Sequence, residues 1–300
     1  MSHKPVLLNE VIESLQVKDN EVFVDLTLGN AGHTKAIIDT GVKNLTVVGI
    51  DADEQATMTA EKVLQEYKDH NIIITTTYFD SLPEVLEENN ISKINKVLID
   101  LGFRSDQVDQ PERGFSFKDD GPLLMTFQSG KDLDENTLTA YEIVNKWEEE
   151  SIADIIFGFG EETFSRAIAK KIVKVREDKP IETTQELADI VKRATPFFYR
   201  HGKIHPATKT FQAIRIAVNS ELDRLEKVLP YLFENLESGG RISIISFHSL
   251  EDRIVKRYFR KKSDEGLANL INKRPITATE EELAENNRAR SAKLRTLEKI

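Results

Sequence analysis

The chain contains no cysteine. This absence excludes a disulfide framework, a thiolate nucleophile and any zinc site built on cysteine. No apolar run approaches the roughly 20 residues that a membrane-spanning helix needs, and the first residues, MSHKPVLLNEVIE, lack the apolar core of a signal peptide. We therefore expect a cytoplasmic protein with no membrane partner.

Acidic residues outnumber basic ones, and the net charge of −10 argues against a polyanionic partner. The distribution of charge argues the other way, because many of the 41 Lys and Arg residues fall in three acid-free stretches, 190–220, 253–262 and 288–295. Each stretch by itself is typical of a solvated helix face. Three of them in the last third of an acidic chain favour a surface that binds a polyanion such as RNA.

Three short apolar runs each end on an aspartate. They are residues 21–25, 45–51 and 96–100, and they end on Asp25, Asp51 and Asp100. Short runs rich in Val and Ile are typical of buried parallel strands. Ligands of open α/β sheets bind at the carboxyl ends of such strands, so the three acids predict one binding site lined with hydrogen-bond acceptors.

The order of elements predicts an α/β domain made of two chain segments. Strands and helices alternate up to residue 100, and 102–130 then reads as an irregular loop. Residues 139–195 are helical in pattern, with helix starts expected at Thr139 and Thr183. A long helix over 206–234, a Gly239-Gly240 turn and a strand over 241–247 resume the α/β pattern. We expect a doubly wound sheet with an all-helical insert.

The turn after Asp25 contains Gly29 and Gly32 and leads into an amphipathic helix. Such a turn lets the backbone approach a ligand, and Asp51 ends the next strand, where an acid accepts hydrogen bonds from a ribose. This pattern serves both nicotinamide dinucleotides and S-adenosylmethionine. The dinucleotide fingerprint G-x-G-x-x-G is incomplete here. An acid such as Asp25 also suits the ammonium group of a methionine moiety, so S-adenosylmethionine is favoured.

Long strings through the chain resemble the bacterial 16S ribosomal RNA (cytosine-N4)-methyltransferase family, of which this sequence looks like a divergent member. They are HKPVLLNE from His3, DLTLGNAGH from Asp25, LIDLG from Leu98, ERGFSF from Glu112, DGPL from Asp120, FGEETF from Phe159, HPATKTFQAIRIAVNSEL from His205, SFHSLEDRIVK from Ser246 and NNRARSAKLR from Asn286. Because the strings keep one order over residues 3 to 295, the resemblance covers the chain.

The resemblance implies a class I Rossmann-like S-adenosylmethionine-dependent methyltransferase with an inserted all-helical domain. The expected boundaries are 1–103 and 206–300 for the methyltransferase domain and 104–205 for the insert, which would recognise the substrate. The implied reaction transfers a methyl group to N4 of a decoding-centre cytidine in 16S rRNA. The implied partner is the small ribosomal subunit or its late precursor. The oligomeric state stays open, and a dimer is one possibility.

The resemblance also implies positions for the site. Its cofactor contacts are Ala31, Gly32 and His33 in the turn, Asp51 on the ribose, Phe79 against the adenine, and Asp100 and Gln107 near the reacting end. The residues expected to contact RNA, from the basic stretches, are Arg193, Arg200, Lys203, Lys209, Arg253, Lys256 and Arg257.

Cytosine N4 is a poor nucleophile, so an enzyme must orient it and accept hydrogen bonds from the amine as it attacks. Asp100, or a carbonyl beside it, is the candidate acceptor. His248 is a second catalytic candidate, with capping of the following helix as the alternative. Glu251 and Asp252 read as first-turn helix carboxylates. No metal site is expected, because the one close pair of histidines, His201 and His205, lies in a basic stretch that would repel a cation.

The chain departs from the family pattern at three places. Ala31 stands where a glycine is usual, the loop after Asp100 is altered, and Leu124 and Thr126 replace an acid and an arginine after DGPL. The missing acid and arginine motivate one alternative to the enzyme, a catalytically weakened rRNA-binding assembly factor of the same fold. A nicotinamide-dependent oxidoreductase is a further alternative, because the glycine turn also suits a dinucleotide.

Overall fold

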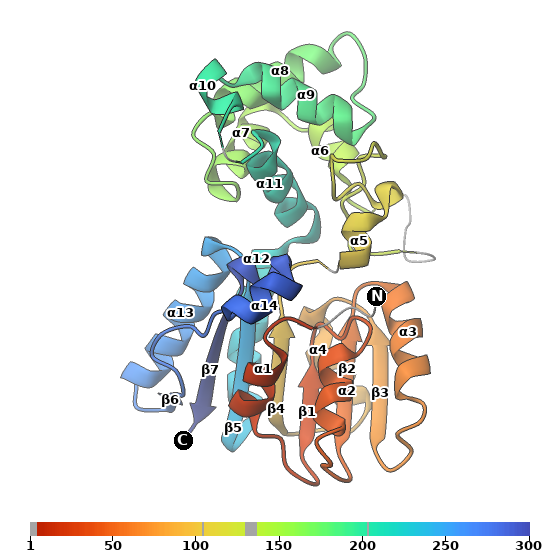
Figure 1. Ribbon diagram of the computed structural model, residues 1–300, viewed down its shortest axis with the longest axis vertical. Coiled ribbons are helices and arrows are strands. Elements are labelled where there is room, and N and C mark those ends of the chain that lie inside the picture. The colour runs from red at the N-terminus through yellow and green to blue at the C-terminus, as the bar shows by residue number, and fades with distance from the viewer. Residues whose placement is uncertain (1–4, 104, 130–136, 203) are drawn as a thin grey trace. The chain divides into compact units, whose positions relative to one another are not determined.

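The computed structural model describes residues 5–103, 105–129, 137–202 and 204–300 of the chain (Figure 1). The chain divides into two compact units. The first comprises Met1–Gly102, Gln128–Gly130 and Leu222–Ile300, and the second comprises Phe103–Phe127 and Lys131–Glu221. The second unit therefore extends beyond the residue 205 expected from the sequence. The roles expected for the two parts stay predictions.

The first unit is built on one seven-stranded sheet with the order β3-β2-β1-β4-β5-β7-β6. Its strands are β1 (Val22–Asp25), β2 (Thr46–Asp51), β3 (Asn71–Thr76), β4 (Ile94–Asp100), β5 (Leu236–Ser246), β6 (Ala268–Leu270) and β7 (Lys293–Lys299). Strands β1 to β5 are parallel, and β7 is antiparallel to β5 and β6. The strand order reverses between β1 and β4, as a doubly wound sheet requires, so the carboxyl ends of β1, β2 and β4 meet there.

Helices cover both faces of this sheet (Figure 1). They are α1 (Leu8–Leu15), α2 (Gly32–Ile38), α3 (Glu54–Leu64), α4 (Leu82–Glu88), α12 (Glu221–Asn235), α13 (Ser249–Asp264) and α14 (Glu280–Glu285), with short 3-10 turns η1 (Phe79–Ser81) and η4 (Asn287–Ser291). Successive strand residues face opposite sides. In β4, Val97 and Ile99 pack with α4, α12 and α13, and Leu98 packs with α1, α2 and α3.

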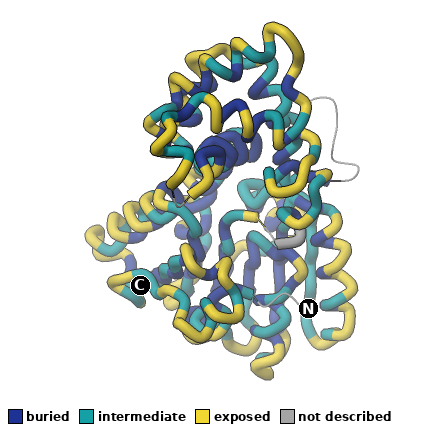
Figure 2. Tube along the Cα trace, turned by 45° about the horizontal axis from the view of Figure 1, so that its top comes forward, coloured by how far each residue is buried: buried dark blue, intermediate teal, exposed yellow. Residues whose placement is uncertain are grey.

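The second unit is helical. Its elements are α5 (Ser105–Asp109), η2 (Pro111–Arg113), α6 (Ala140–Lys146), α7 (Glu149–Gly158), α8 (Ser165–Arg176), α9 (Thr184–Ala194), α10 (Phe197–Arg200) and α11 (Ala207–Asn219). Most residues of α11 are buried or half-buried, and this helix contributes Phe211 and Ile214 to the unit's core (Figure 2). The helical insert predicted from the sequence is thus present, and α11 packs with it.

Two predicted helix starts are confirmed. The Thr139 side chain accepts from the backbone N–H of Glu142, and Thr183 forms a full capping box with Glu186. Each cap provides an acceptor for a backbone donor that has no partner inside the helix. In the described residues, no helix has both the length and the apolar character needed to cross a membrane.

Three expectations about local structure are wrong. The long helix expected over 206–234 is two helices, because Ser220 adopts a left-handed backbone with φ of 50°. The Gly239-Gly240 pair is no turn but lies within β5, where the pairing with β4 shifts between Ile94 and Lys96. The loop after Gly102 contains the short helices α5 and η2. A left-handed residue or a shift in strand pairing depends on contacts in the folded chain, so the local amino-acid composition does not predict it.

Candidate active site at the carboxyl ends of β1, β2 and β4

The turn between β1 and α2 contains two residues with positive φ. Gly29 has a positive φ of 53°, which glycine adopts at no steric cost. Ala31 precedes α2 with φ of 61° in the left-handed region, where a Cβ atom is disfavoured by roughly 1–2 kcal/mol. A Cβ atom added at Gly32 would lie 2.6 Å from Cγ of Pro5. Backbone conformation at Gly29 and close packing at Gly32 therefore favour glycine at these two positions, independently of any ligand.

Asp51 ends β2 and holds two backbone segments. Its Oδ2 accepts from the N–H of Gly29 at 2.8 Å, and its Oδ1 accepts from the N–H of Asp53 at 2.9 Å. The sequence predicted a ribose acceptor at this position and gave no sign of the bond to the turn. Because each carboxylate oxygen has two lone pairs, these bonds fix the orientation of the side chain without using its full acceptor capacity.

Asp25 ends β1 and is fully buried. It accepts a hydrogen bond from Oγ1 of Thr34 at 2.7 Å and one from the N–H of Thr27 at 3.2 Å. Burial raises the pKa of the Asp25 carboxyl to about 6, against the lowering effect of these two bonds, and the charge of Asp51 raises it further. A cation beside Asp25 would reverse this effect.

Asp100 ends β4 and is the least satisfied of the three acids. Its backbone N–H donates to Oγ1 of Thr27 at 2.6 Å, which fixes the strand end. Its Oδ1 is buried and has no hydrogen-bond partner within the described parts of the chain. Burial raises the pKa of Asp100 well above its ordinary value, and the charges of Asp25 and Glu251 add to the shift. An orphaned buried acceptor of this kind indicates a ligand that donates to it.

His33 lies beside Asp100, with its Nδ1 atom 3.9 Å from Oδ2 of the carboxylate. Its Nε2 atom is 2.9 Å from the carbonyl oxygen of Val6, which can only accept, so Nε2 carries a hydrogen. In the neutral ring Nδ1 is then an acceptor turned toward Asp100. The structure therefore brings Asp25, His33, Asp51 and Asp100 to one edge of the sheet, with the turn that contains Ala31 and Gly32.

Two other predicted cofactor contacts are placed differently. Phe79 begins η1, after the carboxyl end of β3, and its half-buried ring packs against the core that contains α4 and α12. This position also suits an aromatic residue of the hydrophobic core. Gln107 is buried within the second unit. The cofactor roles of both residues stay predictions.

The altered segment after DGPL is anchored inside the second unit. The N–H of Met125 donates to the carbonyl of Arg113, and the N–H of Phe127 donates to Oδ1 of Asn219 at 2.7 Å. The guanidinium of Arg113 also donates to the carbonyls of Thr126 and Phe127. These bonds give the segment a fixed backbone although Leu124 and Thr126 replace charged residues.

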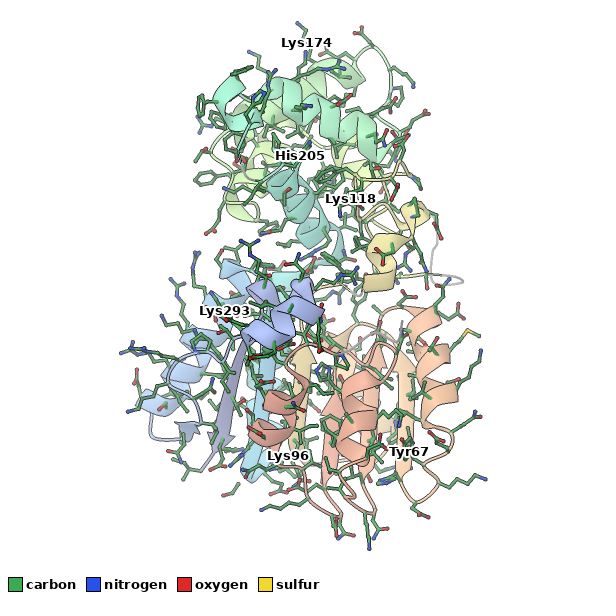
Figure 3. The ribbon with its side chains drawn as sticks, viewed as in Figure 1. Tyr67, Lys96, Lys118, Lys174, His205 and Lys293 are labelled. Atoms are coloured by element: carbon green, nitrogen blue, oxygen red, sulfur yellow. The ribbon has the colours of Figure 1, made fainter. Side chains whose placement is uncertain are left out.

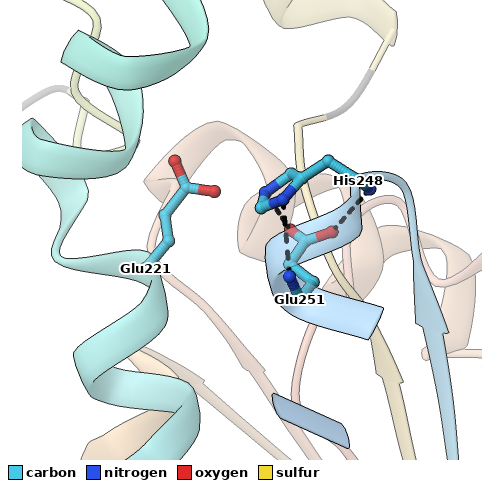
Figure 4. Close-up of side chains that lie close together, drawn as sticks. All are labelled: Glu221, His248 and Glu251. Atoms are coloured by element: carbon cyan, nitrogen blue, oxygen red, sulfur yellow. Dashed lines mark hydrogen bonds and ion pairs between the residues drawn. The ribbon is translucent and has the colours of Figure 1, made fainter. Parts of the chain in front are cut away.

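His248 caps α13 at the end of β5 (Figure 4). Its Nδ1 accepts from the N–H of Glu251 at 3.4 Å, and Oε2 of Glu251 accepts from the N–H groups of His248 and Phe247. Nε2 of His248 lies 3.1 Å from Oε1 of Glu251. The capping alternative for His248 is confirmed, as is the placement of Glu251 and Asp252 in the first turn. The substrate role of His248 stays a prediction.

Replacing Glu251 by alanine is expected to lower the free energy of unfolding by about 1–3 kcal/mol. The change removes the acceptor of two backbone N–H groups at a buried position, and unpaired donors carry a penalty of that order. Urea titration measures the loss. The control is Glu251→Gln, which keeps an acceptor oxygen and should lose less stability. Equal stability of Glu251→Ala and the parent protein would contradict this account of the cap.

The predicted RNA contacts fall on both units. In the second unit Arg193 lies 3.7 Å from Asp189, Arg200 donates to two backbone carbonyls, and Lys209 donates to the carbonyl of Glu161. Lys203 lies outside the described residues. In the first unit, three of the predicted contacts are exposed on α13: Arg253, Lys256 and Arg257. Their contact with RNA stays a prediction.

A doubly wound sheet, a glycine turn after β1 and acids at three strand ends define an α/β protein that binds a nucleoside-containing ligand at its topological switch point. A family model for the MraW methylase family matches residues 1–300. The chain is also 44% identical, over all of both chains, to the ribosomal RNA small subunit methyltransferase H of Trichodesmium erythraeum (strain IMS101). The chain belongs to the MraW methylase family.

Solved structures are also similar to the chain. An rRNA methylase from Streptococcus thermophilus is 12% identical with a TM-score of 0.45, and the match covers 100% of this chain and 99% of that one. A Streptococcus mutans protein solved in complex with SAH is 12% identical with a TM-score of 0.43, and the match covers both chains fully.

Proposed function

We propose that this chain is an S-adenosylmethionine-dependent methyltransferase that modifies N4 of a cytidine in small-subunit ribosomal RNA. Family membership and the full-length similarity to the Trichodesmium methyltransferase support the class of reaction and the RNA. The observation that carries the choice of cofactor and atom is the set of three carboxylates at the ends of β1, β2 and β4. Of these, Asp100 has an orphaned acceptor.

The charge of the site suits the cofactor. The carboxyls of Asp25 and Asp100 both have raised pKa values, first through burial and then through the charges of neighbouring acids. A cationic ligand offsets both effects, because its positive charge favours the ionised carboxylates and an ammonium group donates hydrogen bonds to them. S-adenosylmethionine carries an ammonium and a sulfonium, whereas a nicotinamide dinucleotide carries an anionic pyrophosphate that these acids would repel.

Each of these acids suits a different part of the cofactor. Asp51 is oriented by the N–H groups of Gly29 and Asp53 and would accept hydrogen bonds from the ribose hydroxyls. Asp25 would pair with the ammonium group of the methionine part. When bound, S-adenosylmethionine supplies an electrophilic methyl group.

Asp100 and His33 serve the nucleophile in this proposal. The N4 lone pair of cytosine is delocalised into the ring, so the amine attacks well only when a group accepts its hydrogen bonds and then its proton. The orphaned Oδ1 of Asp100 provides that acceptor. Nδ1 of His33, 3.9 Å from Asp100, provides a second acceptor beside it.

Cofactor titration tests the first part of the proposal. In calorimetry the purified chain should bind S-adenosylmethionine, and fluorescence titration with NADH should show no binding. Binding of NADH in place of S-adenosylmethionine would overturn the assignment and favour an oxidoreductase. Binding of RNA without either cofactor would favour the assembly factor.

The second unit carries an aromatic surface suited to RNA. Phe197 and Phe198 on α10 are 75% and 72% exposed, although a large apolar side chain is usually buried. They lie between Arg193 and Arg200 in the sequence. Exposed aromatic rings among cationic side chains are typical of sites that stack unpaired bases. The enzyme needs its cytidine unstacked, and such a surface would stabilise RNA in which the bases are unstacked.

Replacing Phe197 or Phe198 by alanine should raise the Kd for small-subunit RNA by about 5–150-fold, since stacking of one base is worth about 1–3 kcal/mol. Stability should not change, because both side chains are exposed. Filter binding measures the Kd, and Met58→Ala, at another exposed apolar residue, is the control. An unchanged Kd in both phenylalanine variants would remove this surface from the RNA interface.

A further inference from the structure

A cavity of about 330 Å³ lies in the first unit, beside α13, β6 and β7 and away from the three carboxylates. Four cationic side chains line it, two from α13 (Lys256 and Arg260), one from the segment after β6 (Lys273) and one from β7 (Arg295). Asp264 is the one acid in the lining. Two of the acid-free stretches, 253–262 and 288–295, therefore converge on one hollow in a chain whose net charge is −10.

Two of the four cations are paired within the fold, since Nε of Arg260 lies 3.7 Å from Oδ2 of Asp264 and Arg295 binds Asp252. Arg295 donates to Asp252 from Nε at 2.7 Å and from Nη2 at 3.3 Å. Lys293, which is labelled in Figure 3, has its Nζ atom 3.5 Å from the same carboxylate. These contacts fix the guanidinium and leave its Nη1 without a hydrogen bond to any described residue. Lys256 and Lys273 are exposed and form no ion pair within the described ranges.

The rest of the lining is apolar or rigid. The ring of Phe259 is buried and Leu270 is half-buried, so both give the hollow an apolar floor. Asn272 fixes one wall, because its side-chain NH₂ donates to the carbonyl of Leu294 at 2.9 Å and its oxygen accepts from the N–H of Thr296 at 2.8 Å. A preformed hollow with an apolar floor and a cationic rim fits the sugar and phosphate of a nucleotide unit.

We propose that this cavity binds a backbone phosphodiester of the substrate RNA, outside the nucleotide that is methylated; the inference rests on the proposed function. Lys256 lies seven residues after Ser249, the first residue of α13. A helix rises 1.5 Å per residue, which places Lys256 roughly 10 Å and Arg260 roughly 16 Å along α13 from the strand ends. The cavity thus anchors flanking RNA. Phosphate contacts of this kind set register and affinity without reading sequence.

The test uses the full chain with Lys256 and Lys273 both changed to alanine. The double variant should bind small-subunit RNA about 10-fold more weakly at physiological salt. Its slope of log K against log salt should be shallower by roughly 1.4, since each phosphate contact to a single strand contributes about 0.7. The Kd for S-adenosylmethionine and the Tm should not change. The matched control is the double variant Lys62→Ala and Lys68→Ala, which removes two exposed lysines of the same unit.

Three outcomes would overturn the inference. A salt slope equal to that of the control would show that the cavity makes no phosphate contact, while the proposed function would stand. Binding of AMP or polyglutamate that is lost in the variant, with the RNA slope unchanged, would assign the cavity to a free nucleotide or to an acidic protein. Failure of the parent chain to bind RNA at all would remove the proposed function together with this site.

Discussion

Changing Asp100 to asparagine is expected to lower kcat for methyl transfer to small subunits by about 10²–10⁴-fold, the usual contribution of one positioned acid–base group. Asparagine keeps the shape of the side chain and removes its ability to take a proton. The buried Oδ1 of Asp100 has no partner in the described chain, so the fold does not need this carboxylate to satisfy a donor. Single-turnover transfer of labelled methyl measures the effect.

The pH profile separates this role from a structural one. Because burial raises the pKa of Asp100 in the free enzyme, kcat/KM of the parent enzyme should rise with pH as the carboxylate forms. The rate of Asp100→Asn should lack this rise. Asp69→Asn, at an exposed acid of the same unit, is the control and should keep both the rate and the profile. Transfer by Asp100→Asn at the parent rate would exclude Asp100 from the chemistry.

Changing Asp25 to asparagine should alter how stability depends on pH. The folded protein holds the Asp25 proton up to pH about 6, whereas the unfolded chain loses it near pH 4. Between these values the folded state binds more protons, so the contribution of Asp25 to the free energy of unfolding falls as pH rises. The fall is about 2 kcal/mol between pH 4 and pH 7.

Urea titrations of both proteins across this range measure the effect as a difference, so that titration of other groups cancels. Relative to the parent, the free energy of unfolding of the asparagine variant should increase by about 2 kcal/mol as pH rises from 4 to 7. S-adenosylmethionine should reduce this gain by stabilising the parent, because its ammonium favours the ionised carboxylate. A difference that stays constant with pH would show that Asp25 does not titrate in this window.

The sequence was sufficient to predict the elements that local pattern determines. The apolar runs that end at Asp25, Asp51 and Asp100 form parallel strands, and their carboxyl ends meet where the strand order reverses. Thr139 and Thr183 cap helices as their spacing with a later glutamate predicts. In each case the residues that determine the element are neighbours in the sequence, so the local pattern is enough to predict it.

What the sequence did not predict depends on residues far apart in the chain. The bond from Gly29 to Asp51 and that from Asp100 to the Thr27 hydroxyl join separate strand ends. The break at Ser220 occurs without glycine or proline, beside Asn219, whose side chain binds the backbone of Phe127. Strand β7 pairs antiparallel with β5, and this pairing places Arg295 near α13. Only the folded chain shows these contacts.

The role assigned to the three carboxylates is tested most directly by identifying the modified nucleoside. Small ribosomal subunits that lack the modification are incubated with the protein and S-adenosylmethionine carrying a deuterated methyl group, and the rRNA is digested for mass spectrometry. We predict the label in N4-methylcytidine, and its loss with Asp100→Asn. Label in another nucleoside, or no label although the cofactor binds, would contradict the account.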